Sequence, residues 1–341
     1  MRAVVTVEPR RMELMDRPEP EPRAGEALVR VEAVGICGSD LSLYVGNHPY
    51  ARYPQIQGHE FAGIVERFGG RYDGPVRVGE RVAVEPLQPC GECYPCRHGR
   101  PNCCTRLAVL GAHVPGALVD HIAVRASALY PAGDLDPELA ALVEPVSIGL
   151  QGVNRGTVTA EDMVVVFGAG PIGQAVLLGA VDRGARVLVV DRLASRLELA
   201  RQLGAEEVVD ASGEDATAAI ARWTGGDGPG VVVEATGVPA VIRTAVDVVA
   251  SAGRIVILGL SSQDVALPVL EFTRKELTIL GSRNNAGIFG DAVDLVRRNQ
   301  ERARLLITHR FPLERAPEAV QFALEHPIEA EKVMILMGDN A

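Results

Sequence analysis

The alternation of apolar strands with helical segments between residues 163 and 280 limits the possible folds more than any other feature of this sequence. Short apolar runs predict strands at 163–167, 186–190, 207–209, 231–234, 254–258 and 276–280. Helical patterns follow at 193–203, 215–223 and 240–250. A further helix is expected after the first strand, where a glycine-rich turn leads into an apolar helical run that ends near residue 183. Such alternation is typical of parallel βαβ units, whose strands are buried on both faces. We therefore expect a doubly wound parallel α/β domain in this region.

The segments on either side of this region have a different character. Residues 1–145 are rich in Gly and Pro and contain short β-type runs at 27–33, 61–65, 81–84 and 118–124, which favours an irregular, barrel-like β domain. The tail has helical patterns at 289–299 and 317–325 and a strand pattern at 332–337. A chain of 341 residues is also too long for one compact core. We expect domains at 1–149 and 150–286, and a segment 287–341 that returns to the first domain.

The charge balance and the lack of long apolar runs narrow the function classes. The chain has 34 Lys and Arg against 44 Asp and Glu, a net charge of −10, whereas a nucleic-acid binder needs a basic surface. No apolar stretch reaches the ~20 residues of a membrane-spanning helix. Glu8 and Pro9 come too early for a secretory signal. We expect a cytoplasmic protein that binds neither nucleic acid nor membranes, in which clustered cysteines indicate a metal or catalysis rather than disulfides.

A glycine-rich turn, Gly168-Ala-Gly170-Pro171-Ile172-Gly173, follows a predicted strand and opens a helix. The first glycine permits the tight turn, the second lets a pyrophosphate approach the backbone, and the third lets helix and strand pack closely. A turn without a ligand would have the same pattern. However, Asp191 at the end of the next strand supplies the acidic residue that binds ribose hydroxyls and repels a 2′-phosphate. We predict a dinucleotide site that prefers NAD, although Arg192 and Arg196 could pair with such a phosphate.

Five of the six cysteines lie within fifteen residues of one another. Cys90, Cys93, Cys96 and Cys104 offer four thiolates among turn-forming Gly and Pro residues, and zinc takes four sulfur ligands tetrahedrally in closed, structural sites. Disulfides and an iron–sulfur cluster are the alternatives. From spacing alone, Cys103 and Cys104 are equal candidates for the fourth ligand.

A second group of possible metal ligands is spread along the chain: Cys37, His59, Glu60 and Glu144. Taken singly, each has an ordinary explanation, since isolated Cys and His residues are usually part of a core and Glu144 could cap a helix. Together they supply one sulfur, one nitrogen and carboxylate oxygens. Three protein ligands with one open position is the arrangement of catalytic zinc.

These motifs, in this order and spacing, make the whole chain resemble the zinc-containing medium-chain dehydrogenase/reductase family, and most of all its sorbitol and threonine dehydrogenase branch. The resemblance implies a GroES-like β-barrel catalytic domain, completed by the C-terminal tail, and a Rossmann NAD-binding domain with a doubly wound parallel sheet. It implies two zinc ions per chain, NAD as cofactor, and assembly into dimers or tetramers. The expected activity is oxidation of a CH–OH group in a small molecule.

The resemblance also implies roles for individual residues. Cys37, His59 and Glu144 would bind catalytic zinc with Glu60 beside them, Cys104 would be the fourth structural ligand, and Ser39 would receive the hydroxyl proton. Asp191 and Arg196 would contact ribose, while Leu258, Leu260 and Ser282 would lie near the nicotinamide half. Many relatives carry His where this chain has Ser42 and Gln151, so its proton route differs; His48 or a water chain could replace it.

The substrate is less constrained than the reaction. The sequences Gly281-Ser-Arg-Asn-Asn285, Asn102-Cys-Cys104 and Gly111-Ala-His113 resemble the subgroup that oxidises sugar acids such as L-galactonate or L-gulonate at C5. Arg283 could bind a carboxylate or contact the cofactor, and His113 and Asn284 are further substrate candidates. We expect a polyol or sugar acid. The alternatives are a threonine or simple secondary-alcohol dehydrogenase, and a non-catalytic dinucleotide-sensing regulator.

Overall fold

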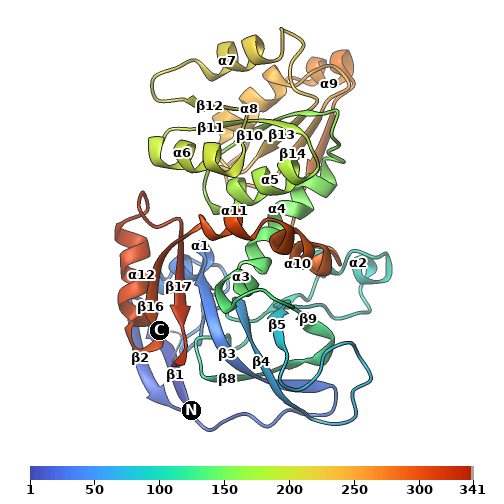
Figure 1. Ribbon diagram of the computed structural model, residues 1–341. Helices are drawn as coiled ribbons and strands as arrows, with labels where there is room; N and C mark the ends of the chain where they lie inside the picture. Colours follow the sequence, from blue (N-terminus) through green and yellow to red (C-terminus); the bar gives the residue numbers. More distant parts are fainter. Residues whose placement is uncertain (339–341) are drawn as a thin grey trace. The chain divides into compact units, whose positions relative to one another are not determined.

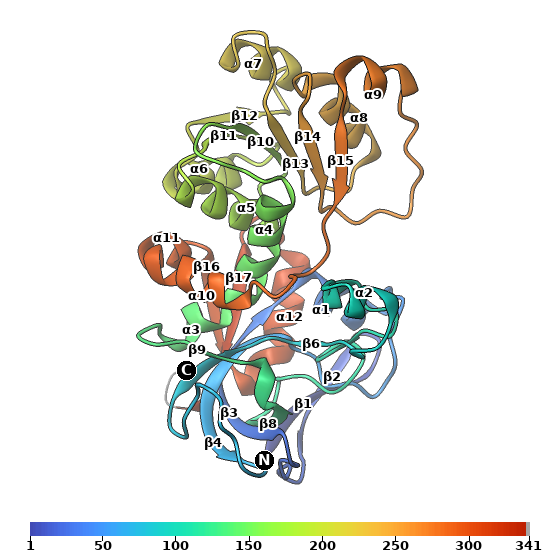
Figure 2. The same cartoon turned by 90° about the vertical axis from the view of Figure 1, so that its right-hand side faces the viewer.

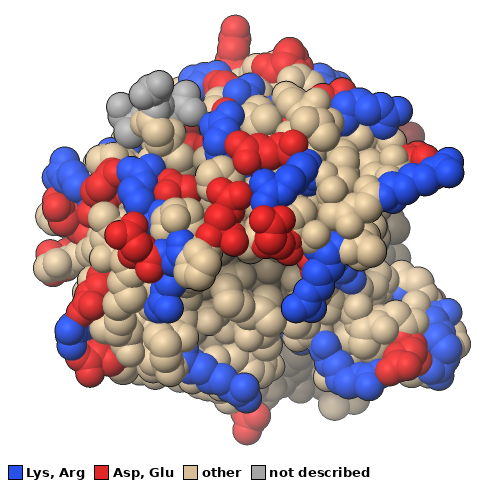
Figure 3. All heavy atoms as spheres, turned by 90° about the horizontal axis from the view of Figure 1, so that it is seen from below, with Lys and Arg blue, Asp and Glu red and all other residues tan. Residues whose placement is uncertain are grey.

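The computed structural model describes residues 1–338, which form two compact units. The first unit contains Met1–Glu144 together with residues 289–338, and the second contains Pro145–Ile288. Among the described helices, none combines the length and the apolar character that crossing a membrane would require. Basic and acidic side chains lie next to one another across the face shown in Figure 3.

The first unit contains a curved main sheet, which includes strands from before and after the second unit in the sequence, and two separate two-stranded sheets (Figure 1). Its strands are β1 (Arg2–Glu8), β2 (Arg11–Asp16), β3 (Glu26–Ile36), β4 (Glu60–Phe68), β5 (Arg81–Val84), β6 (Leu87–Gln88), β7 (Ala108–Val109), β8 (His121–Arg125), β9 (Leu129–Pro131), β16 (Ile307–Pro312) and β17 (Lys332–Leu336). The main sheet has the order β16-β17-β3-β4-β5-β9, with β8 also paired to β3. The long, almost fully buried β3 is therefore its central element.

Short helices and turns complete the first unit: α1 (Gly38–Val45), α2 (Tyr94–Arg97), η1 (Pro101–Cys103), η2 (Ala126–Ala128), α3 (Pro137–Ala141), α10 (Phe289–Arg298), α11 (Gln300–Arg304), η3 (Leu313–Arg315) and α12 (Ala316–Glu325). A further helix, α4 (Val143–Arg155), begins where this unit ends. β17 runs antiparallel to β3, with Val333 opposite Ile36, so the last described strand lies against the strand that leads to Cys37.

The second unit is a six-stranded parallel sheet with helices on both faces (Figure 2), as the strand–helix alternation predicts. Its strands are β10 (Met163–Phe167), β11 (Arg186–Asp191), β12 (Glu207–Asp210), β13 (Val231–Glu234), β14 (Arg254–Ile257) and β15 (Thr278–Gly281). Its helices are α5 (Pro171–Asp182), α6 (Ala194–Leu203), α7 (Ala216–Trp223), α8 (Pro239–Val248) and α9 (Val269–Lys275). The strand order β12-β11-β10-β13-β14-β15 reverses between β10 and β13, and ligands of such sheets bind at that reversal.

Two predicted strands are corrected by the structure. The strand expected at 276–280 begins only at Thr278, because Glu276 has a φ of 52° and ends α9, a helix that the sequence analysis did not include. The strand expected at 118–124 begins only at His121. The backbone before it turns to β1 instead, where Val4 N–H donates to the Leu118 carbonyl over 2.8 Å. The end of α9 thus shortens the first strand locally, whereas contacts with β1 outweigh local strand propensity in the second.

Candidate metal and dinucleotide sites

Cys37, His59 and Glu60 come together in the first unit because β3 and β4 are paired. Cys37 follows β3, His59 and Glu60 lie at the start of β4, and the register places Gly35 opposite Glu60. One ligand atom from each of the three residues lies within 4.8 Å of the other two. A Cβ on Gly35 would lie 2.3 Å from Glu60 Oε2, so only glycine leaves room for the carboxylate. The three donors form a compact group.

Asp40 connects the two segments that carry these donors. One of its carboxylate oxygens accepts a hydrogen bond from Cys37 N–H (2.9 Å), and the other accepts one from Gly58 N–H (3.3 Å). The same oxygen, Oδ1, lies 3.7 Å from His59 Nδ1, whereas His59 Nε2 lies 3.4 Å from Ser39 Oγ. A carboxylate behind a metal-binding histidine fixes its ring orientation in many metal sites. The sequence analysis missed Asp40, although its position three residues after Cys37 suits a bond across the first turn of α1.

Lys332 forms a buried ion pair with Glu60. Its Nζ donates to Glu60 Oε2 (2.6 Å), Glu60 Oε1 (2.8 Å) and the Ile36 carbonyl (3.2 Å). Burial alone would lower the pKa of Lys332, but the negative charges of Glu60, Cys37 and Glu144 outweigh it and raise the pKa. Lys332 thus stays charged and balances part of the negative charge of the site. The sequence analysis missed it, since no local motif links β17 to Glu60.

Glu144 lies in the first turn of α4 and is 5% exposed. Burial, together with the charges of Glu60 and Asp40, raises the pKa of Glu144 to about 7, against the opposing effect of His59 and Lys332. Its carboxylate is not part of the compact group formed by Cys37, His59 and Glu60. Burial would lower the pKa of His59, yet the charges of Asp40, Cys37 and Glu144 raise it well above its usual value. An excess of buried anionic donors is the environment that a divalent cation would neutralise.

The structure also places the residues proposed for proton transfer. Ser39 Oγ lies 3.4 Å from His59 Nε2, beside the metal-ligand group. Ser42 donates to the Gly38 carbonyl over 3.1 Å, so its hydroxyl already has a partner within α1. Gln151 is buried in α4. Burial lowers the pKa of His48, and the charges of Asp40 and His59 also act on it. His113 packs against Tyr50, with 4.4 Å between ring centroids.

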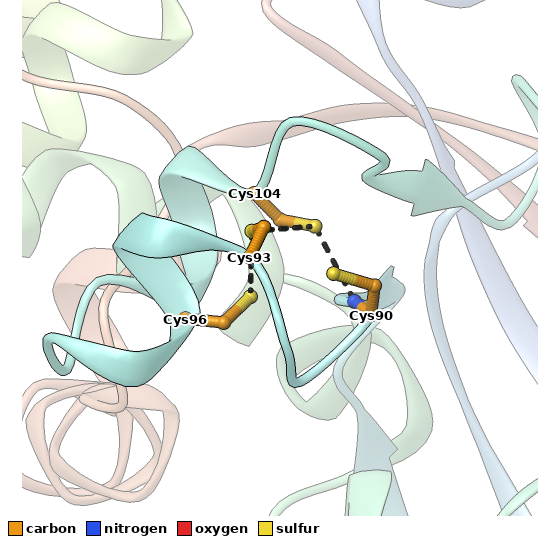
Figure 4. A group of neighbouring side chains, drawn as sticks. All are labelled: Cys90, Cys93, Cys96 and Cys104. Carbon is orange, nitrogen blue, oxygen red and sulfur yellow. Dashed lines mark hydrogen bonds between the residues drawn. The ribbon is translucent and has the colours of Figure 1, made fainter.

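The second ligand group is the four-cysteine lobe shown in Figure 4. The sulfur atoms of Cys90, Cys93, Cys96 and Cys104 all lie within 4.8 Å of one another. Cys93 Sγ lies 3.4 Å from Cys96 Sγ and 3.7 Å from Cys104 Sγ. Cys103 is exposed and lies outside this group, so the geometry selects Cys104 as the fourth donor. Burial would raise the pKa of Cys93, but N–H donors from Cys96 and Thr105 and the neighbouring thiols lower it to about 5. Such a set fits a tetrahedral zinc ion.

The glycine-rich turn and Asp191 meet in the second unit. Gly168 has a φ of 94°, and a Cβ on Gly173 would lie 1.8 Å from the Gly168 carbonyl oxygen. Asp191 accepts hydrogen bonds from Ala169 N–H (2.7 Å), Arg192 N–H (2.7 Å) and Leu193 N–H (2.9 Å). The carboxylate is therefore held beside the turn. Gly170 is the N-cap of α5, where Pro171 and Ile172 begin the helix and N–H groups can bind phosphate.

The other predicted cofactor and substrate residues of the second unit lie at the carboxyl ends of its strands. The guanidinium of Arg196 lies 3.6 Å from the position that a Cβ on Gly170 would occupy. Leu258 and Leu260 follow β14, and Leu260 is 96% exposed. Ser282, Arg283 and Asn284 follow β15. All strands of this parallel sheet end at the same edge, so these residues share that edge with the glycine-rich turn.

Comparison with known proteins identifies both parts of the chain. Residues 23–134 match the alcohol dehydrogenase GroES-like domain, and residues 171–298 match the zinc-binding dehydrogenase family. Sorbitol dehydrogenase of Bacillus subtilis is 33% identical over 98% of this chain and 97% of its own. L-galactonate-5-dehydrogenase of Escherichia coli K12 is 33% identical over 92% of each. These matches confirm the predicted α/β fold with a GroES-like domain and a Rossmann-like parallel sheet.

A solved structure agrees over almost the whole chain. The short chain alcohol dehydrogenase (rspB) from Escherichia coli CFT073, complexed with NADH, has a TM-score of 0.92 and 34% identity, and the match covers 98% of this chain and 99% of that one. The two donor groups fit zinc and the glycine-rich turn fits a nicotinamide dinucleotide. The chain belongs to the zinc-type medium-chain alcohol dehydrogenase family and is an oxidoreductase that acts on CH–OH groups.

Proposed function

We propose that this enzyme oxidises a secondary hydroxyl of a polyol or sugar acid to a ketone and transfers the hydride to NAD. The observation that carries this proposal is the buried group of Cys37, His59 and Glu60, supported by Asp40 and Lys332, in a chain that also has a dinucleotide-binding turn. Similarity to sorbitol and L-galactonate dehydrogenases supports this substrate class.

The donor set suits a catalytic zinc ion held by Cys37, His59 and one carboxylate. The geometry favours Glu60 as that carboxylate, with Glu144 beside it as a second acidic group, whereas the family resemblance favours Glu144. Bound zinc would supply the positive charge that lowers the pKa of a substrate hydroxyl. Asp40 Oδ1 lies 3.7 Å from His59 Nδ1, and Ser39 Oγ lies 3.4 Å from His59 Nε2. Ser39 would accept the hydroxyl proton while its own hydrogen passes on to His48 or a water chain. Cys90, Cys93, Cys96 and Cys104 would hold the structural zinc.

The decisive experiment combines metal analysis with a substrate panel. The wild-type protein is expected to contain two zinc ions per chain and to reduce NAD with polyols or aldonates faster than with threonine or simple secondary alcohols. Cys37→Ala should lose one zinc ion and all activity, whereas Cys103→Ser, at an exposed thiol outside the cluster, should keep both. Ser39→Ala should keep both zinc ions but lose most of its kcat. A fully active Cys37→Ala variant, or a preference for threonine, would contradict the proposal.

The preference for NAD over NADP rests on Asp191. Three backbone N–H groups fix its carboxylate beside the glycine-rich turn, so it cannot move away from a 2′-phosphate without losing them. Arg192 and Arg196 oppose this preference by their charge. Faster reduction of NADP than of NAD by the wild-type enzyme would refute the assignment.

The sugar-acid form of the substrate rests on Arg283, with the neighbouring Asn284 as a further contact. A guanidinium is the natural bidentate partner of a carboxylate. If Arg283 binds the acid group, Arg283→Leu should raise the KM for aldonates by about tenfold, the worth of one charge-assisted hydrogen bond, and leave the KM for neutral polyols unchanged. Equal effects on both substrate classes would assign Arg283 to the cofactor instead.

We also propose that the enzyme is a homo-oligomer in which the second unit pairs with its copy. β15 is the edge strand of the parallel sheet and ends in the exposed Gly281. The preceding chain exposes Leu260 (96%), Val269 (78%) and Leu270 (70%). An open strand edge next to exposed apolar side chains suits pairing with a second copy about a twofold axis.

A cytoplasmic location is the last part of the proposal. All six cysteines are free thiols, and four of them form the proposed structural zinc site. Thiols persist in reducing compartments, whereas an oxidising compartment would favour disulfides between sulfur atoms this close. Recovery of the protein in a periplasmic or secreted fraction would contradict this location.

A further inference from the structure

Glu234, the last residue of β13, is a buried carboxylate that the proposed reaction does not use. It is 0% exposed. Its oxygens accept hydrogen bonds from Thr236 N–H (2.7 Å), Gly237 N–H (3.0 and 3.1 Å) and the Thr236 hydroxyl. The bonds to this carboxylate thus come from two backbone N–H groups and one hydroxyl, all of which lie in the turn that follows β13. Within residues 1–338, no basic side chain pairs with it.

This negative charge lies at the point where the strand order reverses. Glu234 is opposite Phe167, the residue before the glycine-rich turn, and Thr236 Cγ2 lies 2.8 Å from where a Cβ on Gly168 would be. On the other side, Glu234 Oε2 lies 2.8 Å from where a Cβ on Gly259 would be. The carboxylate is thus packed between the glycine-rich turn and the chain that follows β14.

The strand order also indicates which half of the cofactor is near Glu234. Dinucleotides lie across the carboxyl edge of such a sheet at the reversal. Asp191, which suits the ribose of the adenosine half, ends β11 on one side of β10. β13 and β14 lie on the opposite side of β10 and therefore border the nicotinamide half. Glu234, at the end of β13, is therefore buried on the side of the reversal that borders the nicotinamide half.

The two redox forms of the cofactor differ in charge at the nicotinamide ring, which is cationic when oxidised and neutral when reduced. All contacts to adenosine, ribose and pyrophosphate are common to both forms. A buried anion without a basic partner interacts with a nearby cation more strongly than a solvated one does. We propose that Glu234 is a fixed counter-charge that strengthens binding of NAD+ relative to NADH and so favours alcohol oxidation. This inference rests on NAD as cofactor and is independent of which alcohol is the substrate.

Equilibrium binding tests this proposal without turnover. Dissociation constants for NAD+ and NADH would be measured by calorimetry for the wild-type protein, Glu234→Gln and Thr236→Val. Glu234→Gln removes the charge and is expected to weaken NAD+ binding about tenfold more than NADH binding, a change that corresponds to about 30 mV in the potential of the bound couple. Thr236→Val removes a hydrogen bond to the carboxylate but keeps the charge, so it should change both constants by the same factor.

Equal weakening of both forms in Glu234→Gln would overturn the proposal, because a residue that only shapes the turn would act on both alike. Should that variant not fold, Val238→Lys places a cation in the same turn, at a side chain that is 47% exposed. It is expected to shift the ratio of the two constants in the same direction by about twofold. An unchanged ratio in every variant that folds would also overturn the proposal. Failure of the wild-type protein to bind either form would instead refute the cofactor assignment.

Discussion

At the scale of single residues, the metal-ligand group is a cluster of buried charges that needs neutralisation. Glu60, Cys37 and Glu144 each act electrostatically on Lys332, and Lys332 forms a buried ion pair with Glu60. Removing one partner of a buried ion pair leaves an uncompensated charge and costs about 3–5 kcal/mol, whereas exposed pairs contribute little. Zinc bound to the same donors would replace part of that compensation.

Lys332→Met is therefore expected to destabilise the zinc-free protein far more than the zinc-loaded protein. Without zinc, the midpoint of thermal unfolding should fall by several degrees, and zinc should restore most of the loss. Lys275→Met is the matched control, because Lys275 is also a buried lysine but donates only to the carbonyls of Val246, Asp247 and Val249 in the second unit. The loss of thermal stability in Lys275→Met should be the same with and without zinc. Equal losses with and without zinc in Lys332→Met would contradict the role assigned to Lys332.

Glu144 makes a second prediction, on the pH dependence of stability. Its pKa is raised from 4.5 to about 7 in the native state, so the native state holds this proton more tightly than the unfolded state does. The stability of the zinc-free protein must then fall as the pH rises from about 4.5 to 7, by at most about 3 kcal/mol. Glu144→Gln abolishes this effect. The zinc-free variant and the zinc-free wild type should therefore have similar free energies of unfolding at pH 5, and the variant should be the more stable of the two at pH 8.

Denaturant unfolding at the two pH values measures this difference, and exposed Glu161 provides the control. Glu161→Gln should show the same difference from wild type at both pH values. A stability difference for Glu144→Gln that does not grow with pH would mean that Glu144 titrates normally.

At the scale of elements, the four-cysteine lobe depends on its ion. The lobe contains only the short elements β6, α2, η1 and β7, and its local core of buried residues is limited to Leu87, Cys104 and Leu107. So little apolar burial cannot offset the conformational entropy of about twenty ordered residues. Four bonds from one zinc ion would fix the lobe instead.

Cys93→Ser should consequently unfold the lobe locally and leave the rest of the protein folded. Trypsin would then cleave after Arg97 or Arg106 at least tenfold faster than in the wild type, while one zinc ion per chain and the dinucleotide affinity remain. Cys103→Ser, with its side chain outside the cluster, should keep the wild-type cleavage rate. Slow cleavage of Cys93→Ser would show that the lobe folds without its ion.

At the scale of the whole molecule, the open edge at β15 predicts an assembly. Leu270→Asp places a charge on the exposed apolar surface near that strand, and we expect it to lower the molar mass in solution to that of a smaller species. Light scattering coupled to size exclusion measures this. Leu14→Asp, on β2 of the first unit and 44% exposed, is the control and should keep the wild-type mass. A wild-type protein that is monomeric at micromolar concentration would contradict the proposed assembly.

The features that depend on local spacing could be predicted from the order of the amino acids alone. The turn Gly168–Gly173 with Asp191 and the Cys90–Cys104 spacing are short local patterns, and each strand–helix step of the alternation is local too. The parallel sheet and the four-sulfur group follow from these patterns. Only the tertiary structure brought Lys332 to Glu60, 272 residues away, and Asp40 to His59. Only the tertiary structure likewise placed Glu60 rather than Glu144 in the compact donor group. The physical reason is that pairing of β17 with β3, and of β3 with β4, sets these contacts, and strand pairing at long range leaves no periodic signal in the sequence.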